Sequence, residues 1–364
     1  MDSAKIYKME FRRSIFMTGF PGFIAERLLI RLAQKDVQFY LLVQQEFVEK
    51  AMQEVERIAL ESTAPLENFT IVKGDITQGN LGIDNEDLEL LRDEVTDVFH
   101  LAAIYDLEVS RDAAMSVNVE GTKNVNEFVR SIASLHRYNY ISTCYVAGAR
   151  KGRIFETELD HNKGFLNFYE ESKYLAEQEV EKLKEEINVT VYRPSVVVGD
   201  SKTGETSKYD GIYYLIKYMM RNPNILRMVN VGNKDVRLNL VPVDFVADAI
   251  AELSGDDKAI GKTVALADPD PLTTKDLFDL IAENLSGKRS VWNPPANLVR
   301  TFLSSSISPA ITGLPLSAVP YFYTPKTYDT SIADELLTQH GVRCPGFAVY
   351  ISNLLDFVKK NPDL

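Results

Sequence analysis

The feature that most constrains the fold is a regular alternation between short apolar runs, rich in β-branched residues, and longer amphipathic stretches. The apolar runs lie at 14–18, 38–43, 69–73, 97–101, 138–142 and 189–193, and helical patterns lie at 22–34, 46–60, 114–133 and 167–187. Strands that are apolar throughout and separated by helices indicate a parallel sheet covered on both faces. Because crossovers between parallel strands are right-handed, we predict an α/β fold with a doubly wound, Rossmann-like sheet.

The pattern changes after Pro194, where short strands at 237–241 and 263–266 lie among helices and prolines become frequent. We therefore predict a Rossmann domain at 1–200, with 236–255 returning to it. Residues 201–235 and 256–364 are predicted to form a smaller, mostly helical substrate-binding lobe. We expect this lobe to cover the C-terminal edge of the sheet, where open α/β sheets bind ligands.

Charge and cysteine usage exclude several classes of protein. The 364 residues include 40 Lys and Arg against 52 Asp and Glu, a net charge of -12, which argues against a nucleic-acid or anionic-membrane surface. Cys144 and Cys344 have no paired spacing, so we predict no disulfide framework and no metal site. Residues 1–5 lack the apolar core of a signal peptide and no apolar run reaches spanning length, so we expect a cytoplasmic protein without an integral membrane segment.

A glycine-containing turn follows the first predicted strand, with the sequence Thr18-Gly19-Phe20-Pro21-Gly22-Phe23-Ile24-Ala25. Gly19 allows a tight turn, Gly22 lets backbone N–H groups approach a pyrophosphate, and Ala25 keeps the following helix close to the strand. Glycine turns also occur in folds that bind no nucleotide. The position of this one between a first strand and a first helix favours a dinucleotide site.

The end of the second strand bears on which dinucleotide binds. An acidic residue there would bind the adenosine ribose of NAD, and an arginine would bind the 2′-phosphate of NADP. The chain has Gln44 at this position and Lys50 further along, where it is too distant to decide the question. The missing acid favours NADP and leaves NAD open.

The third and fourth strands end in residues suited to the same ligand. Asp75, followed by Ile76, is placed to accept a hydrogen bond from the adenine amino group, although a turn aspartate is the alternative. The small residues in Leu101-Ala102-Ala103 would let the backbone lie against the cofactor. We interpret the preceding His100 as a packed strand residue rather than a catalytic one.

Tyr169 and Lys173 are the strongest candidates for chemistry. Residues four apart share one face of a helix, so both side chains can reach one site. A nearby ammonium is expected to lower the pKa of the tyrosine and make it a better acid–base group. A Tyr-x-x-x-Lys spacing is common by chance, but Ser142-Thr143 ends the preceding strand, where a hydroxyl could hydrogen-bond a carbonyl substrate.

The order of these motifs resembles an extended short-chain dehydrogenase/reductase. The motifs are Thr-Gly-x-x-Gly-Phe-x-Ala at 18–25, Gly-Asp-Ile at 74–76, His-Leu-Ala-Ala at 100–103, Asn-Val-x-Gly-Thr at 118–122, Ser-Thr at 142–143, Tyr-x-x-x-Lys at 169–173 and Arg-Pro-Ser at 193–195. The wording at 18–25, 192–200 and 241–248 is similar to the male-sterility-type domain of fatty acyl-CoA reductases and thioester reductases. The resemblance covers about the first 255 residues.

This resemblance implies roles for individual residues. Tyr169 would donate a proton to the carbonyl oxygen, Lys173 would tune Tyr169 and bind the nicotinamide ribose, and Thr143, with Ser142 as the alternative, would fix the carbonyl. Asn118 would support the cofactor side of the site. The implied cofactor-binding set is Thr18, Gly19, Phe20, Pro21, Gly22, Phe23, Ile24, Gln44, Asp75, Ile76, Leu101, Ala102, Ala103, Asn118, Tyr169, Lys173, Pro194, Ser195 and Val196.

The function implied is NAD(P)-dependent hydride transfer to or from the carbonyl of an apolar aldehyde, ketone or acyl thioester. Gln44 stands where NADPH-using relatives commonly carry arginine, and the chain ends before the extra C-terminal domain of many fatty acyl-CoA reductases. A sugar-nucleotide epimerase or dehydratase is the alternative, disfavoured by Cys144 and Tyr145 beside the threonine. A dinucleotide-sensing regulator is less favoured because the Tyr/Lys pair is intact. Folds of this kind commonly form homodimers.

Two stretches of the predicted lobe bear on the substrate. Residues 298–316 are apolar and interrupted by prolines, and a short stretch before them is rich in aromatic residues and methionine. Both patterns are typical of a lid over an apolar ligand but also of helices packed on the core of the lobe. The residues of the short stretch are Tyr209, Tyr213, Tyr214, Tyr218, Met219 and Met220.

Overall fold

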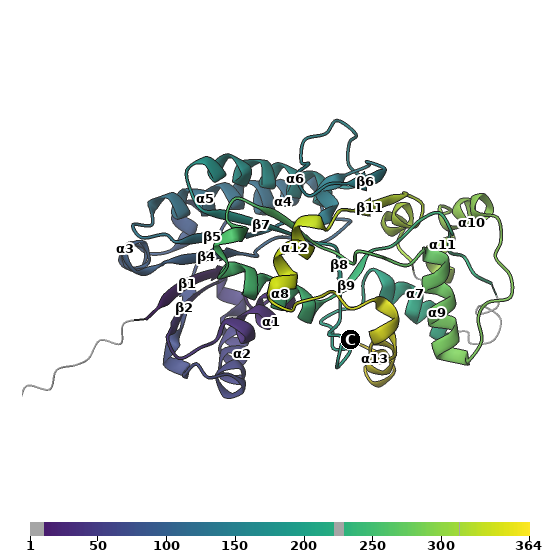
Figure 1. The fold of residues 1–364 in the computed structure, drawn as a ribbon, viewed down its shortest axis with the longest axis horizontal. Helices are drawn as coiled ribbons and strands as arrows, with labels where there is room; N and C mark the ends of the chain where they lie inside the picture. Colours follow the sequence, from purple (N-terminus) through teal and green to yellow (C-terminus); the bar gives the residue numbers. More distant parts are fainter. Residues whose placement is uncertain (1–10, 222–228, 313) are drawn as a thin grey trace, which may run out of the picture.

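The computed structural model describes residues 11–221, 229–312 and 314–364 (Figure 1). The expectations for residues 1–5, and the parts of the predicted lobe at 222–228 and 313, lie outside these residues. A seven-stranded parallel sheet in the order β10-β7-β5-β4-β1-β2-β3 forms the centre of the fold. The predicted doubly wound Rossmann sheet is therefore confirmed. Its strands are β1 (Arg13–Thr18), β2 (Val37–Val43), β3 (Phe69–Lys73), β4 (Asp97–His100), β5 (Arg137–Ile141), β7 (Val189–Pro194) and β10 (Thr263–Leu266).

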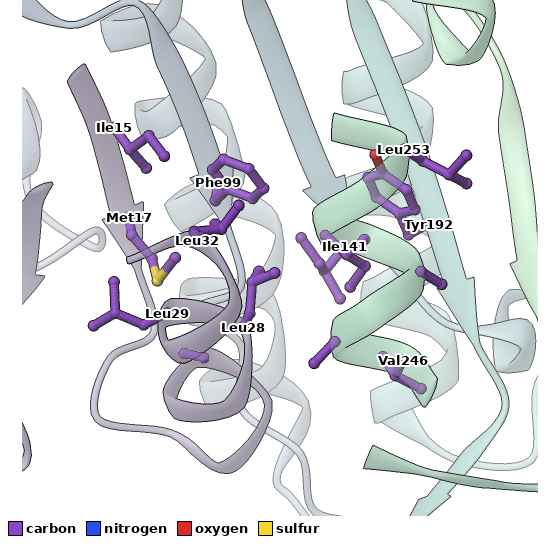
Figure 2. Close-up of a cluster of buried hydrophobic side chains, with 14 of the residues drawn as sticks. Ile15, Met17, Leu28, Leu29, Leu32, Phe99, Ile141, Tyr192, Val246 and Leu253 are labelled. Carbon is purple, nitrogen blue, oxygen red and sulfur yellow. The ribbon is translucent and has the colours of Figure 1, made fainter. Parts of the chain in front are cut away.

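The sheet is buried on both faces because successive side chains of a strand point to opposite sides. In β1, Ile15 and Met17 belong to the apolar layer covered by helices α1, α2, α8 and α12, whereas Phe16 belongs to the layer covered by α3, α5 and α6. Figure 2 shows part of the first layer, in which side chains of α1 and α8 lie over the strands. The helices are α1 (Phe23–Leu32), α2 (Val48–Glu61), α3 (Asn85–Glu94), α5 (Gly121–Ser131), α6 (Phe168–Glu181), α8 (Val243–Ser254) and α12 (Ser331–Gln339).

One predicted helix is not continuous. The segment at 114–133 begins with α4 (Arg111–Ala114), continues as a π-helical stretch (Met115–Glu120) and only then enters α5. Single π-helical turns within α-helices often occur at functional sites. Here the turn carries Asn118, a residue of the predicted site.

A second, smaller body lies to the right of the sheet in Figure 1. Helices α7 (Ile212–Arg221), α9 (Thr274–Ser286) and α13 (Phe347–Lys360) form its core, and α10 (Ala296–Leu303), α11 (Ser308–Thr312) and a 3₁₀-helix (Leu316–Phe322) lie beside them. Tyr213 and Met219 belong to this core, so the aromatic stretch is mainly helix packing. Strands β8 (Val196–Val198) and β9 (Leu240–Pro242) form a separate parallel pair. Within the described residues, no helix is both long and apolar enough to cross a bilayer.

Two elements expected in the smaller lobe belong to the sheet instead. Strand β10 is the edge strand and pairs in parallel with β7, and α12 packs on the apolar layer beneath it. The buried carboxylate of Glu156 joins the two elements. It accepts hydrogen bonds from the backbone N–H groups of Ala265 (2.8 Å) in β10 and of Ile332 (2.6 Å) and Ala333 (3.1 Å) in α12. Periodicity could not reveal this arrangement, because a four-residue apolar run is compatible with a strand of the central sheet and with a strand of the smaller lobe.

Candidate active site

A cavity of about 790 Å³ opens at the carboxyl ends of β1 and β4, where the strand order reverses. Ligands bind at this place in open α/β sheets. Its walls come from the glycine turn, the ends of β2 to β5 and β7, and the start of α6. Of the residues predicted to form the site, all except Asn118 line this cavity. The tertiary fold therefore brings together segments that lie up to 178 residues apart, from Thr18 to Val196.

The glycine turn leaves room for a phosphate group. Gly19 has a φ of 88°, and a Cβ there would lie 2.7 Å from the backbone nitrogen of Ala102. A Cβ on Gly22 would lie 2.6 Å from the carbonyl oxygen of Gly19. Helix α1 begins directly after Gly22, without a side-chain cap, and its first residues line the cavity. Uncapped N–H groups at a helix start favour an anion, so the turn fits the pyrophosphate of a dinucleotide.

The end of the cavity formed by the segments after β2 and β3 carries the residues predicted to meet the adenosine. The Gln44 side chain donates to Asp75 Oδ2 (3.0 Å), and Asp75 Oδ1 accepts from the backbone N–H and the hydroxyl of Thr77, both at 2.8 Å. Burial favours the neutral acid, but these hydrogen bonds outweigh it and lower the pKa of Asp75. Asp75 is therefore a carboxylate fixed at the cavity wall.

Lys50 also lines this end of the cavity, which sequence reasoning did not anticipate. Its ammonium donates to the carbonyl oxygen of Pro21 (3.3 Å) and lies 3.6 Å from Glu26. Lys50 lies in the first turn of α2, which runs back alongside the glycine turn. Lys50 and Gln44 therefore line the same cavity, although six positions separate them in the sequence.

Thr143, Tyr169 and Lys173 meet at the centre of the cavity. Asn167 caps α6 by accepting from the backbone N–H of Glu170 (3.0 Å), which places Tyr169 in the first turn. Thr143 follows β5, and its hydroxyl accepts from the backbone N–H of Tyr145 (3.1 Å). The Lys173 ammonium donates to the carbonyl oxygen of Ile141 (2.9 Å) and to the Tyr140 hydroxyl (3.1 Å).

The charge states of the pair differ from the prediction in one respect. Burial raises the pKa of Tyr169, and a hydrogen bond from Thr143 opposes this rise. The expected lowering of the Tyr169 pKa by Lys173 is wrong, because the ammonium is directed toward β5. Burial also lowers the pKa of Lys173 to about 8, with Glu177 opposing the change. Tyr169 is therefore a neutral phenol near pH 7, which is the form that can donate a proton.

His100 and Asn118 lie behind the cavity wall. The two His100 ring nitrogens contact the hydroxyls of Thr18 (2.8 Å) and Thr122 (3.1 Å), and burial lowers its pKa to about 3. Asn118 accepts from the backbone N–H of Ile104 (2.9 Å) and donates to the Ser172 hydroxyl (2.9 Å). It therefore supports Ile104, which lines the cavity, without lining it itself.

Comparison with known proteins bears on these residues as a set. A family model described as male sterility protein matches residues 17–250. The chain belongs to this family. The match spans both walls of the cavity, from the glycine turn through Thr143 and the Tyr/Lys pair to Val196.

Relatives of this male sterility family member include reductases. The chain is 23% identical over 274 residues to fatty acyl-CoA reductase wat of Drosophila melanogaster, covering 65% of this chain and 53% of that protein. It thus spans about half the length of that relative. The terminal R domain of the myxalamid PKS-NRPS pathway superposes with a TM-score of 0.82 at 24% identity, covering 97% of this chain and 92% of that chain.

The fold likeness extends beyond reductases. UDP-glucuronic acid 4-epimerase from Bacillus cereus superposes with a TM-score of 0.66 at 19% identity, covering 96% of this chain and 97% of that chain. At such identities the likeness shows the fold alone. The predictions of the male-sterility-type family and of the extended short-chain dehydrogenase/reductase fold are confirmed.

Several residues of the cavity wall in this family member escaped sequence reasoning. The Tyr105 ring stands edge-on to Tyr169 with centroids 5.0 Å apart, and Lys208 lies over Tyr105 at 4.4 Å and 2.8 Å from Asp210. Tyr145 stacks on Tyr321 of the second lobe at 4.7 Å. Tyr105, Lys208 and Asp210 come from loops that carry no motif, whereas Tyr145 lies in a 3₁₀-turn directly after Thr143. The only signal was the excess of tyrosine, 17 in all.

Proposed function

We propose that this chain is an NADPH-dependent reductase that transfers hydride to the carbonyl carbon of an apolar acyl thioester, aldehyde or ketone. The observation that carries the proposal is the convergence of Thr143, Tyr169 and Lys173 on the cavity that also contains the glycine turn. Carbonyl reduction needs a hydride donor for the carbonyl carbon and a proton donor for the oxygen of the same carbonyl group. The chain shares its fold with epimerases, but a shared fold alone does not support epimerase activity.

The residues of the chain divide the work as follows. The glycine turn and the start of α1 would hold the pyrophosphate, and Asp75 would accept from the adenine amino group. When bound, the reduced nicotinamide supplies the hydride. Tyr169 donates its phenolic proton to the carbonyl oxygen, Thr143 hydrogen-bonds the same oxygen, and the Lys173 ammonium stabilises the negative charge that develops there.

The proposal is tested by following NADPH absorbance with a long-chain acyl-CoA, and then with the corresponding free aldehyde and a ketone. We expect oxidation that depends on both the protein and the carbonyl compound. Binding of NADPH without oxidation by any of these carbonyls would count against a reductase. It would direct attention to sugar nucleotides and the epimerase alternative.

Lys50 supports the choice of NADPH over NADH. It is a cation on the wall of the cavity that Gln44 also lines, and Gln44 follows the end of β2, where the adenosine 2′-phosphate would lie. We expect Lys50→Ala to raise KM for NADPH about tenfold, as for the loss of one charged hydrogen bond, and to leave KM for NADH unchanged. Steady-state kinetics with both cofactors checks this, with Lys182→Ala, directly after the end of α6, as control. An equal change for both cofactors would contradict the assignment.

A second cavity supports an apolar substrate. It measures about 50 Å³ and is lined mainly by apolar residues of the smaller lobe, among them Tyr214, Phe278, Phe302 and Leu314. Tyr214 and Leu107 pack against the same apolar cluster, which includes Leu314, and Leu107 lies two residues after Tyr105 on the wall of the large cavity. The far end of an alkyl chain held at Tyr169 could thus reach it.

We expect Leu314→Phe, which fills this second cavity, to lower kcat/KM for long-chain acyl substrates by about tenfold and to leave short-chain substrates unaffected. Leu316→Phe is the matched control, because Leu316 is exposed two residues further along. The measurement is kcat/KM of both variants with acyl substrates of increasing chain length. Equal loss for all lengths would mean that the variant perturbs the lobe rather than a chain-binding site.

A further inference from the structure

Glu177 is a buried acid that the proposed reaction does not use. It follows Tyr169 and Lys173 at four-residue intervals, so the three side chains lie along one face of α6. Its side chain is fully buried, with 0% of its surface exposed. A carboxylate is stable in such a place only when it is paired and hydrogen-bonded.

Both carboxylate oxygens of Glu177 have partners. Oε1 accepts from Arg193 Nε (2.9 Å) and Nη2 (2.5 Å), and Oε2 accepts from the Ser142 hydroxyl. Arg193 is itself buried, and its Nη1 donates to the carbonyl oxygens of Glu156 (3.2 Å) and Glu158 (3.0 Å). Both Arg193 N–H groups thus donate to one carboxylate oxygen, in a charge-assisted contact that leaves Oε2 for Ser142.

These contacts join three walls of the large cavity. Ser142 lines the cavity and immediately precedes Thr143, while Arg193 immediately precedes Pro194, which lines it too. The third wall is α6 itself, with Lys173 one turn before Glu177. Because the Ser142 hydroxyl is engaged by Glu177, Thr143 is the better candidate to hydrogen-bond a substrate carbonyl.

The charge of Glu177 also acts on Lys173, whose side chain is buried. Two other titratable groups face the ammonium: Tyr140 from β5 and His100 from β4. Tyr169 precedes Lys173 by one turn on α6, and the ammonium is directed away from it toward β5. Burial raises the pKa of both tyrosines and lowers that of His100 to about 3, so all three are neutral near pH 7. Glu177 is the anion that opposes the effect of burial on the pKa of Lys173.

We propose that Glu177 is a positioning residue of the active site, whose carboxylate, held by Arg193, fixes the Ser142–Thr143 end of β5 and provides the counter-charge of the Lys173 ammonium. The effect of Glu177 on turnover rests on the proposed function. The effect of Glu177 on Lys173 is independent of that function, because it exists in the protein without substrate.

The first test is the titration of Lys173 in the whole protein by NMR of lysine side chains, with Lys173→Arg to assign the signal. We expect Glu177→Gln to move the titration of Lys173 downward by about one pH unit or more, because the variant removes the anion that favours the ammonium. Glu179→Gln is the matched control, since Glu179 lies on the same helix but pairs with Lys182. An unchanged titration in Glu177→Gln would overturn the electrostatic part of the proposal.

The second test uses turnover. The ammonium form of Lys173 is lost as pH rises through its pKa, so we expect reductase activity to fall above about pH 8. The same fall should begin at lower pH in Glu177→Gln. Activity that keeps its pH profile in this variant, while the NMR titration shifts, would separate Glu177 from catalysis. Absence of any reductase activity in the parent protein would contradict the proposed function and leave the NMR result standing.

A third test uses Glu177→Asp and does not depend on whether the Glu177→Gln variant folds. It keeps the charge but withdraws the carboxylate by one methylene group, so we expect Lys173 to titrate close to its original pH. We expect kcat to fall about tenfold through displacement of Thr143, with KM for NADPH little changed. An Asp variant with unaltered kcat would overturn the positioning role.

Discussion

Replacement of Tyr169 by phenylalanine is expected to lower kcat by about 10²- to 10⁴-fold, the range for removal of a general acid. The substitution deletes only the phenolic hydroxyl, and the ring remains packed edge-on against Tyr105. We therefore expect the affinity for NADPH to stay nearly unchanged. Steady-state turnover with the best carbonyl substrate and a separate measurement of NADPH binding make the test.

The control for this variant is Tyr174→Phe on the same helix. Tyr174 is similarly buried, but its hydroxyl contacts Asp160 (3.4 Å) and Gln178 (3.0 Å) outside the large cavity. The control should keep its activity. If Tyr169→Phe also kept full activity, another group would have to supply the proton, and the assignment of the site would fail.

Replacement of Gly19 by alanine is expected to weaken dinucleotide binding by at least about tenfold. The new Cβ would lie 2.7 Å from a backbone nitrogen and 2.8 Å from a backbone carbon of the Leu101–Ala102 segment, neither of which is a movable side chain. The φ of 88° adds strain, which typically costs about 1–3 kcal/mol. The turn and the opposite wall of the cavity must therefore separate, and NADPH binding by fluorescence or calorimetry should report it.

Gly261→Ala is the matched control for Gly19→Ala. Gly261 also has a positive φ, 74°, but a Cβ there meets no atom within 4 Å, and the residue lies outside the cavity. This variant should lose some stability and keep its affinity for NADPH. If Gly19→Ala bound NADPH as tightly as the parent protein, the glycine turn would not be the pyrophosphate site.

The sequence predicted those parts of the site whose residues lie close together in one segment of the chain. The turn at Gly19 and Gly22 follows a strand and opens a helix, and the spacing of Tyr169 and Lys173 is that of a helical face. Each pattern has a local physical cause, backbone freedom in the first case and helix periodicity in the second. Their meeting in one cavity follows from the parallel sheet, whose strands end at one edge.

Other features depend on contacts between distant segments. Lys50 reaches the cavity because the start of α2 lies against Pro21 of the glycine turn, and Tyr105 meets Tyr169 because the loop after β4 contacts the start of α6. Neither residue stands in a motif. Strand β10 likewise joins the main sheet through its pairing with β7, which a short apolar run cannot specify.

The sequence by itself determined the sheet, the glycine turn between β1 and α1, and the placement of Tyr169 and Lys173 on one helix face, because periodicity and glycine conformation act over a few neighbouring residues. Only the tertiary structure decided the protonation of that pair. The pKa of Tyr169 rises and that of Lys173 falls mainly through burial, and burial depends on the whole surrounding fold. The clamp of Glu177, Arg193 and Ser142 is also tertiary, since its members come from α6 and the ends of two different strands.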